Sequence, residues 1–182
     1  MTIPGLLPQP STSSASGAMM TPHTESTPTA ADQAPQESIA WLLRQFVADV
    51  PGITHTVLLS RDGMRLLDSD VDKDWADELA AGIAGVDSLA KNITGPTFAK
   101  RPARQVVIER ADCLIFVQTA GRSKAFPGNP GNLRGVVDTV LAVVATPTAD
   151  AAAIGFEMSR LVDRFAPYMD IPVRVPAGEE PR

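Results

Sequence analysis

Six acidic residues between positions 68 and 78 form the densest charge run in the chain: Asp68, Asp70, Asp72, Asp74, Asp77 and Glu78. Paired carboxylates can transfer protons or hold Ca²⁺, but these six lack the regular ligand spacing of a calcium-binding loop. The run leads into a predicted helix, and the helix dipole favours negative charge at a helix N-terminus. We therefore interpret the run as a solvated connection and helix start, with contact to a basic partner surface as the alternative.

Cysteine and histidine are too few for a zinc site, which needs several of them close together. The single cysteine is Cys113, and of two histidines only His55 lies outside the N-terminal tail. Cys113 begins an apolar run and is interpreted as a small buried hydrophobic residue, with a redox or catalytic thiol as the alternative. His55 alternates with apolar strand residues, and no nucleophile-elbow pattern frames a serine that could complete a triad with it. We expect no catalytic residue, no metal ligand and no cofactor.

Glycine and proline are frequent in residues 121–134, which are predicted to form a long loop. The segment is not a phosphate-binding P-loop, because no glycine precedes Lys124 and the next predicted element is a strand. Its glycines are interpreted as turn formers. An arginine finger that accelerates GTP hydrolysis in a partner remains an alternative, with three exposed candidates: Arg61, Arg122 and Arg134.

Composition predicts one domain between two tails. The chain has 182 residues, of which 44% are hydrophobic and 20% charged, as in ordinary soluble domains. Residues 1–35 are rich in Ser, Thr, Pro, Ala and Gln, contain no Lys or Arg, and are predicted to be disordered. A translation start at Met19 or Met20 is an alternative. The domain is expected at 36–175, and 176–182 form a flexible tail.

The net charge of −5 argues against nucleic acid as a partner, since binding phosphate backbones needs a marked basic face. The nearest basic group, Lys100, Arg101 and Arg104, is interpreted as a solvated loop beside a strand. No apolar stretch is long enough to span a bilayer, and no secretory signal begins the chain. We expect a cytoplasmic protein.

Hydrophobic periodicity predicts eight elements in the order αββαβββα. They are helix 39–50, strands 53–60 and 64–67, helix 74–93, strands 105–110, 113–119 and 135–145, and a helix over 154–165. Asp62 and Gly63 between the first two strands predict a hairpin. The valine-rich fifth strand suits a central position buried on both faces. Thr148 or Asp150 is expected to cap the last helix.

The helix predicted at 74–93 carries two sets of residues at helical spacing. One is an apolar stripe, which contains Trp75, Leu79, Ile83, Val86, Ala90 and Ile93. The other is a strip of small residues, which contains Ala76, Ala80, Ala84 and Ser88. Small side chains let another backbone approach closely. The strip packs either on the chain's own sheet or on a second helix across a dimer axis, and the sequence leaves both open.

This order of elements, with the hairpin Leu58 to Gly63 and the small-residue helix, resembles the roadblock family. That family includes dynein light chains and bacterial regulators of Ras-like small GTPases such as the gliding-motility protein MglB, and the resemblance is strongest to an actinobacterial branch encoded beside a small GTPase. It implies an α/β fold, an α+β sandwich whose five-stranded antiparallel sheet has one helix on one face and two on the other. It also implies a homodimer in which the second helices meet.

The function implied by the resemblance is that of a non-catalytic homodimeric regulator. It binds a Ras-like small GTPase and modulates its nucleotide cycle or localisation. The resemblance speaks against an arginine finger, because such activators reposition the GTPase's own residues. The alternative is a scaffold that links a sensor-kinase-like protein to other components without changing GTP turnover.

The partner and dimer interface is expected on the second helix, at Trp75, Leu79, Ala80, Ile83, Ala84, Asp87 and Ser88. A secondary contact is expected around the hairpin tip and the long loop, at Arg61, Asp62, Arg122 and Arg134.

Overall fold

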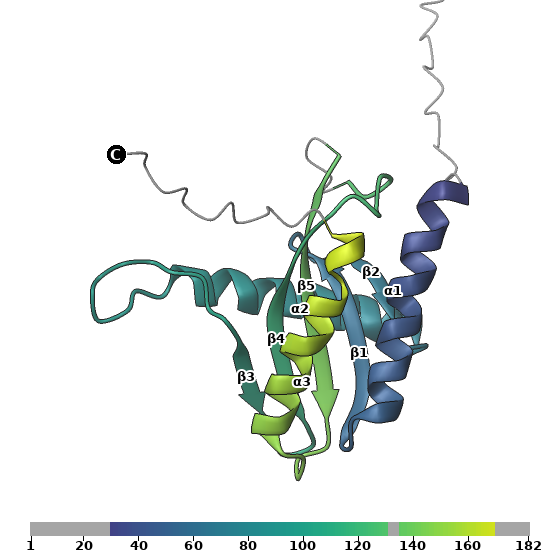
Figure 1. Ribbon diagram of the computed structural model, residues 1–182. Helices are drawn as coiled ribbons and strands as arrows, with labels where there is room; N and C mark the ends of the chain where they lie inside the picture. Colours follow the sequence, from purple (N-terminus) through teal and green to yellow (C-terminus); the bar gives the residue numbers. More distant parts are fainter. Residues whose placement is uncertain (1–29, 131–134, 170–182) are drawn as a thin grey trace, which may run out of the picture.

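The computed structural model describes residues 30–130 and 135–169. Most of the predicted N-terminal tail, all of the predicted C-terminal tail, and Arg134 therefore lie outside the described residues. The described part forms one sheet with helices on its two faces (Figure 1). The predicted order αββαβββα is confirmed, and a short 3₁₀ helix, η1 (Ala166–Tyr168), follows the last α-helix.

Five antiparallel strands make the sheet: β1 (Ile53–Ser60), β2 (Arg65–Asp68), β3 (Val106–Glu109), β4 (Leu114–Ser123) and β5 (Val137–Ala145). Their order across the sheet is β2-β1-β5-β4-β3. β5 is central as predicted, and every residue of it except Asp138 is buried. Branched aliphatic side chains suit this position because both faces of the strand are covered.

The predicted hairpin between β1 and β2 is confirmed. Gly63 adopts a left-handed φ of +92°, which favours glycine. The Gly63 N–H donates to the Ser60 carbonyl at 2.9 Å, and the Ser60 N–H donates to the Met64 carbonyl at 2.8 Å. The turn therefore has the tight geometry that Asp62 and Gly63 predicted.

Helices α1 (Ala30–Asp49) and α3 (Ala151–Arg164) cover one face of the sheet, and α2 (Lys73–Asn92) lies on the other (Figure 1). Alternate residues of each strand point to opposite faces, which gives two cores. The larger core joins α1 and α3 to side chains such as Leu58, Phe116 and Leu141. The smaller core joins α2 to the sheet and contains Val57, Leu59, Ala76, Ala80, Ile83, Ile115, Val117, Val140, Ala142 and Val144.

Two boundaries differ by several residues from the sequence prediction, and the structure chooses between the two caps predicted for α3. α1 begins at Ala30, so Pro35 lies inside the helix and the domain boundary predicted at residue 36 falls within it. α3 is capped by Asp150, whose carboxylate accepts from the N–H groups of Ala152 and Ala153, and not by Thr148. β4 continues to Ser123, because a bulge at Thr119–Gly121 lets its pairing with β5 resume.

The extension of β4 corrects the placement of Arg122. The sequence put this residue in a long loop that starts at position 121. Arg122 instead belongs to β4 and pairs in register with Asp138 of β5. The glycines and prolines further along the segment predicted a loop, so the continuation of β4 to Ser123 was not predicted.

Candidate partner-binding surface

The start of α2 accounts for part of the acidic run. The Asp72 carboxylate accepts from the Trp75 N–H at 2.9 Å and caps the helix. Asp77 forms ion pairs with Lys73 at 2.9 Å and Arg65 at 2.8 Å. Hydrogen bonds from Lys73 first and then from Arg65 hold the pKa of Asp77 below its ordinary value. Asp74 and Glu78 remain exposed on the outer side of the helix.

One side of α2 is buried against the sheet and carries several residues of the predicted interface. Ala80 is fully buried, Ile83 is 3% exposed and Asp87 is 6% exposed. Side chains buried to this extent offer little surface to a partner while the protomer stays folded. Ala80 and Ile83 pack α2 on the sheet, with Ile83 also at the wall of the groove described below, and Asp87 is ion-paired within the chain.

Asp87 joins the middle of α2 to the hairpin tip. Its carboxylate pairs with Lys91 one turn later and with Arg61, whose Nε lies 3.9 Å away. Arg61 Nη1 also lies 2.9 Å from the carboxylate of Asp138, which Arg122 Nε approaches at 3.7 Å. Both arginines are thus engaged within the chain. Asp62, next to Arg61, is exposed and accepts a hydrogen bond from Ser60.

The small-residue strip packs on the chain itself. Ala76 and Ala80 lie on the sheet. A β-carbon built on Gly63 would lie 3.3 Å from the Ala84 Cβ and 3.3 Å from the Ala81 Cα, so the hairpin turn rests directly on α2. Of the two interpretations left open by the sequence, packing within the chain describes these alanines. Ser88 is exposed beyond them.

The opposite flank of α2 faces a groove of about 750 Å³. Trp75, Leu79, Gly82 and Val86 line it from the helix, and Leu89 follows at the same helical spacing. We call these five residues the outer stripe. Trp75 is 38% exposed and Leu89 is 70% exposed. The floor consists of sheet residues that include Ile108, Ile115 and Val144. Within the described residues nothing covers this apolar flank.

Two of the residues first considered for chemistry line this groove. His55 lies on β1 at the sheet face, as predicted, and its ring centroid is 5.0 Å from that of Trp75. Cys113 lies at the β3–β4 turn and is only partly buried. Burial raises the pKa of the Cys113 thiol, and the nearby Asp112 carboxylate raises it further. A thiol with a raised pKa is a poor nucleophile near neutral pH.

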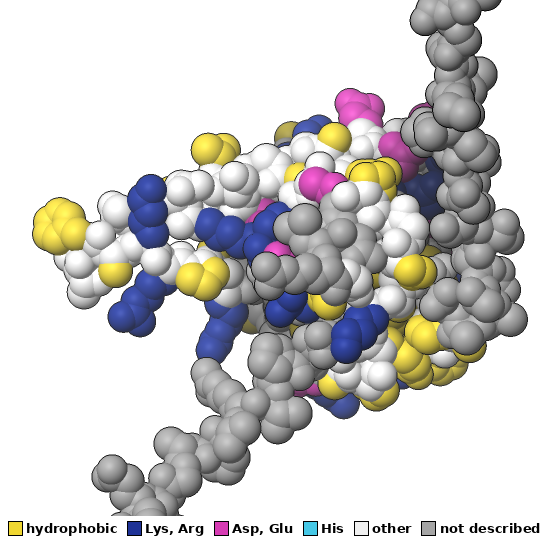
Figure 2. All heavy atoms as spheres, turned by 90° about the horizontal axis from the view of Figure 1, so that it is seen from above, with side chains coloured by type: hydrophobic (Ala, Val, Ile, Leu, Met, Phe, Trp, Pro, Cys, Tyr) yellow, Lys and Arg dark blue, Asp and Glu magenta, His cyan; other side chains and the backbone are white. Residues whose placement is uncertain are grey.

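The segment between α2 and β3, residues 93–105, projects from the body of the molecule (Figure 1), and we call it the arm. Figure 2 shows hydrophobic and basic side chains gathered on it. Phe98 is 89% exposed and Ile93 is 69% exposed. Lys100, Arg101 and Arg104 are exposed as the sequence predicted, but they lie on a projection and not on a loop against the sheet.

Metal-binding clusters and membrane spans are both absent from the part of the chain that the structure describes. There, His, Cys, Asp and Glu nowhere gather in a group of three that could hold a metal ion. None of the helices in that part combines the length and apolar character that a bilayer-spanning segment requires.

Comparisons with known proteins identify the family. A family model described as the Roadblock/LC7 domain matches residues 39–125. A solved Roadblock/LC7 domain from Streptomyces avermitilis is 39% identical to the chain, with a TM-score of 0.57, and the match covers 70% of this chain and 94% of that one. The chain belongs to the Roadblock/LC7 family. The resemblance stated from the sequence is confirmed.

The fold of this Roadblock/LC7 chain is also similar to that of solved MglB proteins. The gliding protein MglB of Thermus thermophilus gives a TM-score of 0.57 at 17% identity, covering 74% of this chain and 90% of that one. MglB of Myxococcus xanthus gives 0.55 at 10% identity, covering 72% and 87%. A comparison with curated proteins gives no match. At these identities the MglB structures establish a shared fold.

Proposed function

We propose that this Roadblock/LC7 chain is a cytoplasmic, homodimeric, non-catalytic regulator that binds a Ras-like small GTPase and modulates its nucleotide cycle or localisation. The observation that carries the proposal is the uncovered outer stripe of α2 beside its groove. An exposed apolar flank rimmed by polar residues is typical of a protein interaction site.

The homodimer is proposed to form along the outer stripe and the free edge of β3. β3 pairs only with β4 among the described strands, and its Val107 is 49% exposed. A stable interface buries about 1,200–2,000 Å² in total, which a 20-residue helix together with a strand edge can supply. One of the MglB structures with this fold is described as having a tetrameric arrangement, so self-association occurs in a protein of this fold.

The GTPase is proposed to bind on the α2 side of the dimer. Membership in the Roadblock/LC7 family supports this partner, because the family includes regulators of such GTPases. The ion pairs of Arg61, at the hairpin tip, and of Arg122, on β4, support a regulator without chemistry of its own. Arg61 and Arg122 share Asp138, so neither guanidinium extends freely as an arginine finger would.

The test uses a Ras-like small GTPase of the class that bacterial members of the family regulate. GTP hydrolysis and nucleotide release are measured with and without the regulator, and complex formation is followed by size-exclusion chromatography with light scattering. Leu89→Glu places a charge on the outer stripe and is expected to abolish dimerisation and weaken the complex. Phe156→Ala, an exposed aromatic on α3 at the other face of the sheet, is the matched control.

A stable complex with unchanged GTP turnover and nucleotide release would favour the scaffold function instead. Absence of any complex, with the wild-type protein folded and dimeric, would contradict the GTPase proposal and leave the dimer intact.

A further inference from the structure

The arm has an apolar tip that its own domain does not cover. Phe98 is 89% exposed and has a left-handed φ of +57°, an unfavourable backbone for an aromatic residue. Two hydrogen bonds shape this tip: the Gly95 N–H donates to the Ala99 carbonyl at 3.2 Å, and the Phe98 N–H donates to the Gly95 carbonyl at 2.9 Å. An ordered turn that presents a large apolar side chain outward is suited to insertion into another surface.

Charge is distributed unevenly along α2 and the arm. Residues 93–108 contain three basic residues and no acidic one. The other end of α2 has exposed Asp74 and Glu78, and Glu78 also lines the groove. The 20 residues of α2 span about 30 Å, so one protomer has opposite charges at two distant ends of one helix.

This charge distribution selects one orientation for two copies that meet along α2. A parallel pair would place acidic ends together and basic arms together, which is repulsive. An antiparallel pair with twofold symmetry places the arm of each copy against the acidic start of the other copy's α2. If the helices cross near Gly82 and Gly85, antiparallel pairing places Asn92, the last residue of α2, near Trp75 of the second copy, and the arm begins at that point.

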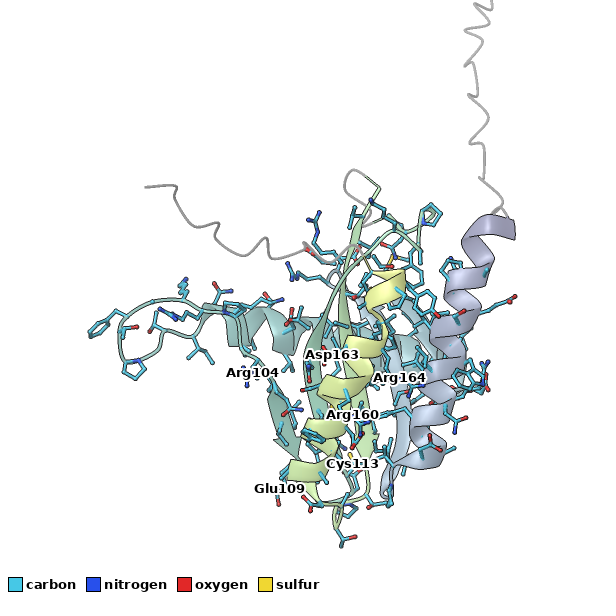
Figure 3. All side chains as sticks on the ribbon, in the orientation of Figure 1. Arg104, Glu109, Cys113, Arg160, Asp163 and Arg164 are labelled. Atoms are coloured by element: carbon cyan, nitrogen blue, oxygen red, sulfur yellow. The ribbon has the colours of Figure 1, made fainter. Side chains whose placement is uncertain are left out.

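The arm cannot fill the same groove in its own protomer. Figure 3 shows Arg104 and Glu109 at opposite ends of β3, with Cys113 near the Glu109 end. The arm thus leaves the sheet at the end remote from the β3–β4 turn. Trp75 lies near the start of α2, whereas the arm follows its last residue.

We propose that each copy inserts Phe98 into the groove of the other, among Trp75, Leu79 and Cys113, with the basic arm residues beside Glu78 and Asp74. This inference rests on the proposed homodimer and adds that the Phe98 side chain of the second copy fills the groove. The groove has an apolar floor, and its lining carries Glu78 together with the ion-paired Arg110 and Asp112, a net negative charge that matches an aromatic tip flanked by cations. An anionic bilayer matches the arm less well, because the chain as a whole is negatively charged.

Cross-linking tests the contact through the native cysteine. Phe98→Cys is treated with a short bis-maleimide at pH 8, for long enough that the slowly reacting Cys113 thiol is alkylated, and is separated on a denaturing gel. A covalent dimer is expected, and it should disappear when Cys113→Ser is added, because the link joins position 98 of one copy to Cys113 of the other. Phe156→Cys is the matched control and should not link to Cys113.

Fluorescence provides a second readout in a Trp41→Phe background, where Trp75 is the only tryptophan. Phe98→Ala should shift Trp75 emission to the red and raise the dimer dissociation constant by about tenfold or more, as loss of an aromatic anchor does. Phe156→Ala should change neither quantity.

The outcomes separate this inference from the function on which it rests. A monomeric wild type would remove the proposed dimer and the arm contact together. A stable wild-type dimer without the position 98 to Cys113 link, and with Trp75 emission unchanged by Phe98→Ala, would overturn the arm contact alone. The same result with Phe98-dependent sedimentation on phosphatidylserine vesicles would replace it with lipid insertion.

Discussion

Gly63 at the β1–β2 turn lies against Ala84 of α2, so closely that an added β-carbon would stand 3.3 Å from the Ala84 Cβ. Because Gly63 has no side chain, the turn can lie in direct contact with α2. This contact sets which flank of α2 faces the hairpin and which faces the groove.

Gly63→Ala is expected to destabilise the fold, because it combines a left-handed φ of +92° with that tight contact. The expected loss in free energy of unfolding is about 1–3 kcal/mol, measured by urea denaturation. Gly128→Ala is the matched control. Its φ is not left-handed and its β-carbon meets nothing within 4 Å, so it should leave stability unchanged or raise it by up to about 1 kcal/mol. Equal stability of the two variants would show that the turn does not depend on this packing.

Asp87→Ala should destabilise the protein by about 1–3 kcal/mol, because it removes a buried acceptor from Lys91 and Arg61. Asp138→Asn, at a carboxylate that is 39% exposed, should cost about 0–1 kcal/mol. Both are measured by chemical unfolding at neutral pH. A larger loss for Asp138→Asn would place the main hairpin anchor on β5 and not on α2.

The Asp77 ion pairs predict an acid-dependent contribution to stability. Lys73 and Arg65 lower the pKa of Asp77 in the folded state. A carboxylate with a lowered folded pKa stabilises the fold fully above its unfolded pKa of about 4, and this contribution is lost as the pH falls through the folded value. The difference in melting temperature between wild type and Asp77→Asn should therefore be constant at neutral pH, begin to shrink near pH 4, and disappear only once the pH is below the lowered folded pKa. A difference that grows on acidification would contradict this linkage.

Cys113 should react slowly with iodoacetamide in the folded protein. Burial raises the pKa of its thiol, and only the thiolate is the reactive form. Mass spectrometry at pH 8 should find slower alkylation in native buffer than in urea. Equal rates in the two conditions would contradict the raised pKa.

The hairpin and the order of elements could be predicted because their signals are local. Asp62 and Gly63 between two apolar runs define a turn, and the valines of β5 define a strand covered on both faces. The orientation of α2 could not be predicted in this way. Ala84 and Val86 are two positions apart on one helix, and only the docking of the hairpin turn determines which of them faces the groove.

The projection of the arm also depends on tertiary structure. Gly95 and Pro96 predict a loop, but no local signal states that Phe98 points away from the sheet. The basic residues around it were visible in the sequence, and the absence of acidic residues from 93 to 108 was the available clue. Arg122 was misplaced because a bulge carries β4 past Gly121, and a bulge depends on the partner strand.

The two edge strands of the sheet, β2 and β3, differ in how readily a strand from another copy could pair with them. β2 has four residues, and its end residues Arg65 and Asp68 are ion-paired to each other. Short, charge-bearing edge strands resist further strand addition. β3 is equally short, but its first three residues, Val106, Val107 and Ile108, are apolar and carry no charge. If two copies pair through β3, the outer edges of the joined sheet are both β2. Because β2 resists strand addition, no third copy can be added, and strand pairing cannot build a fibre.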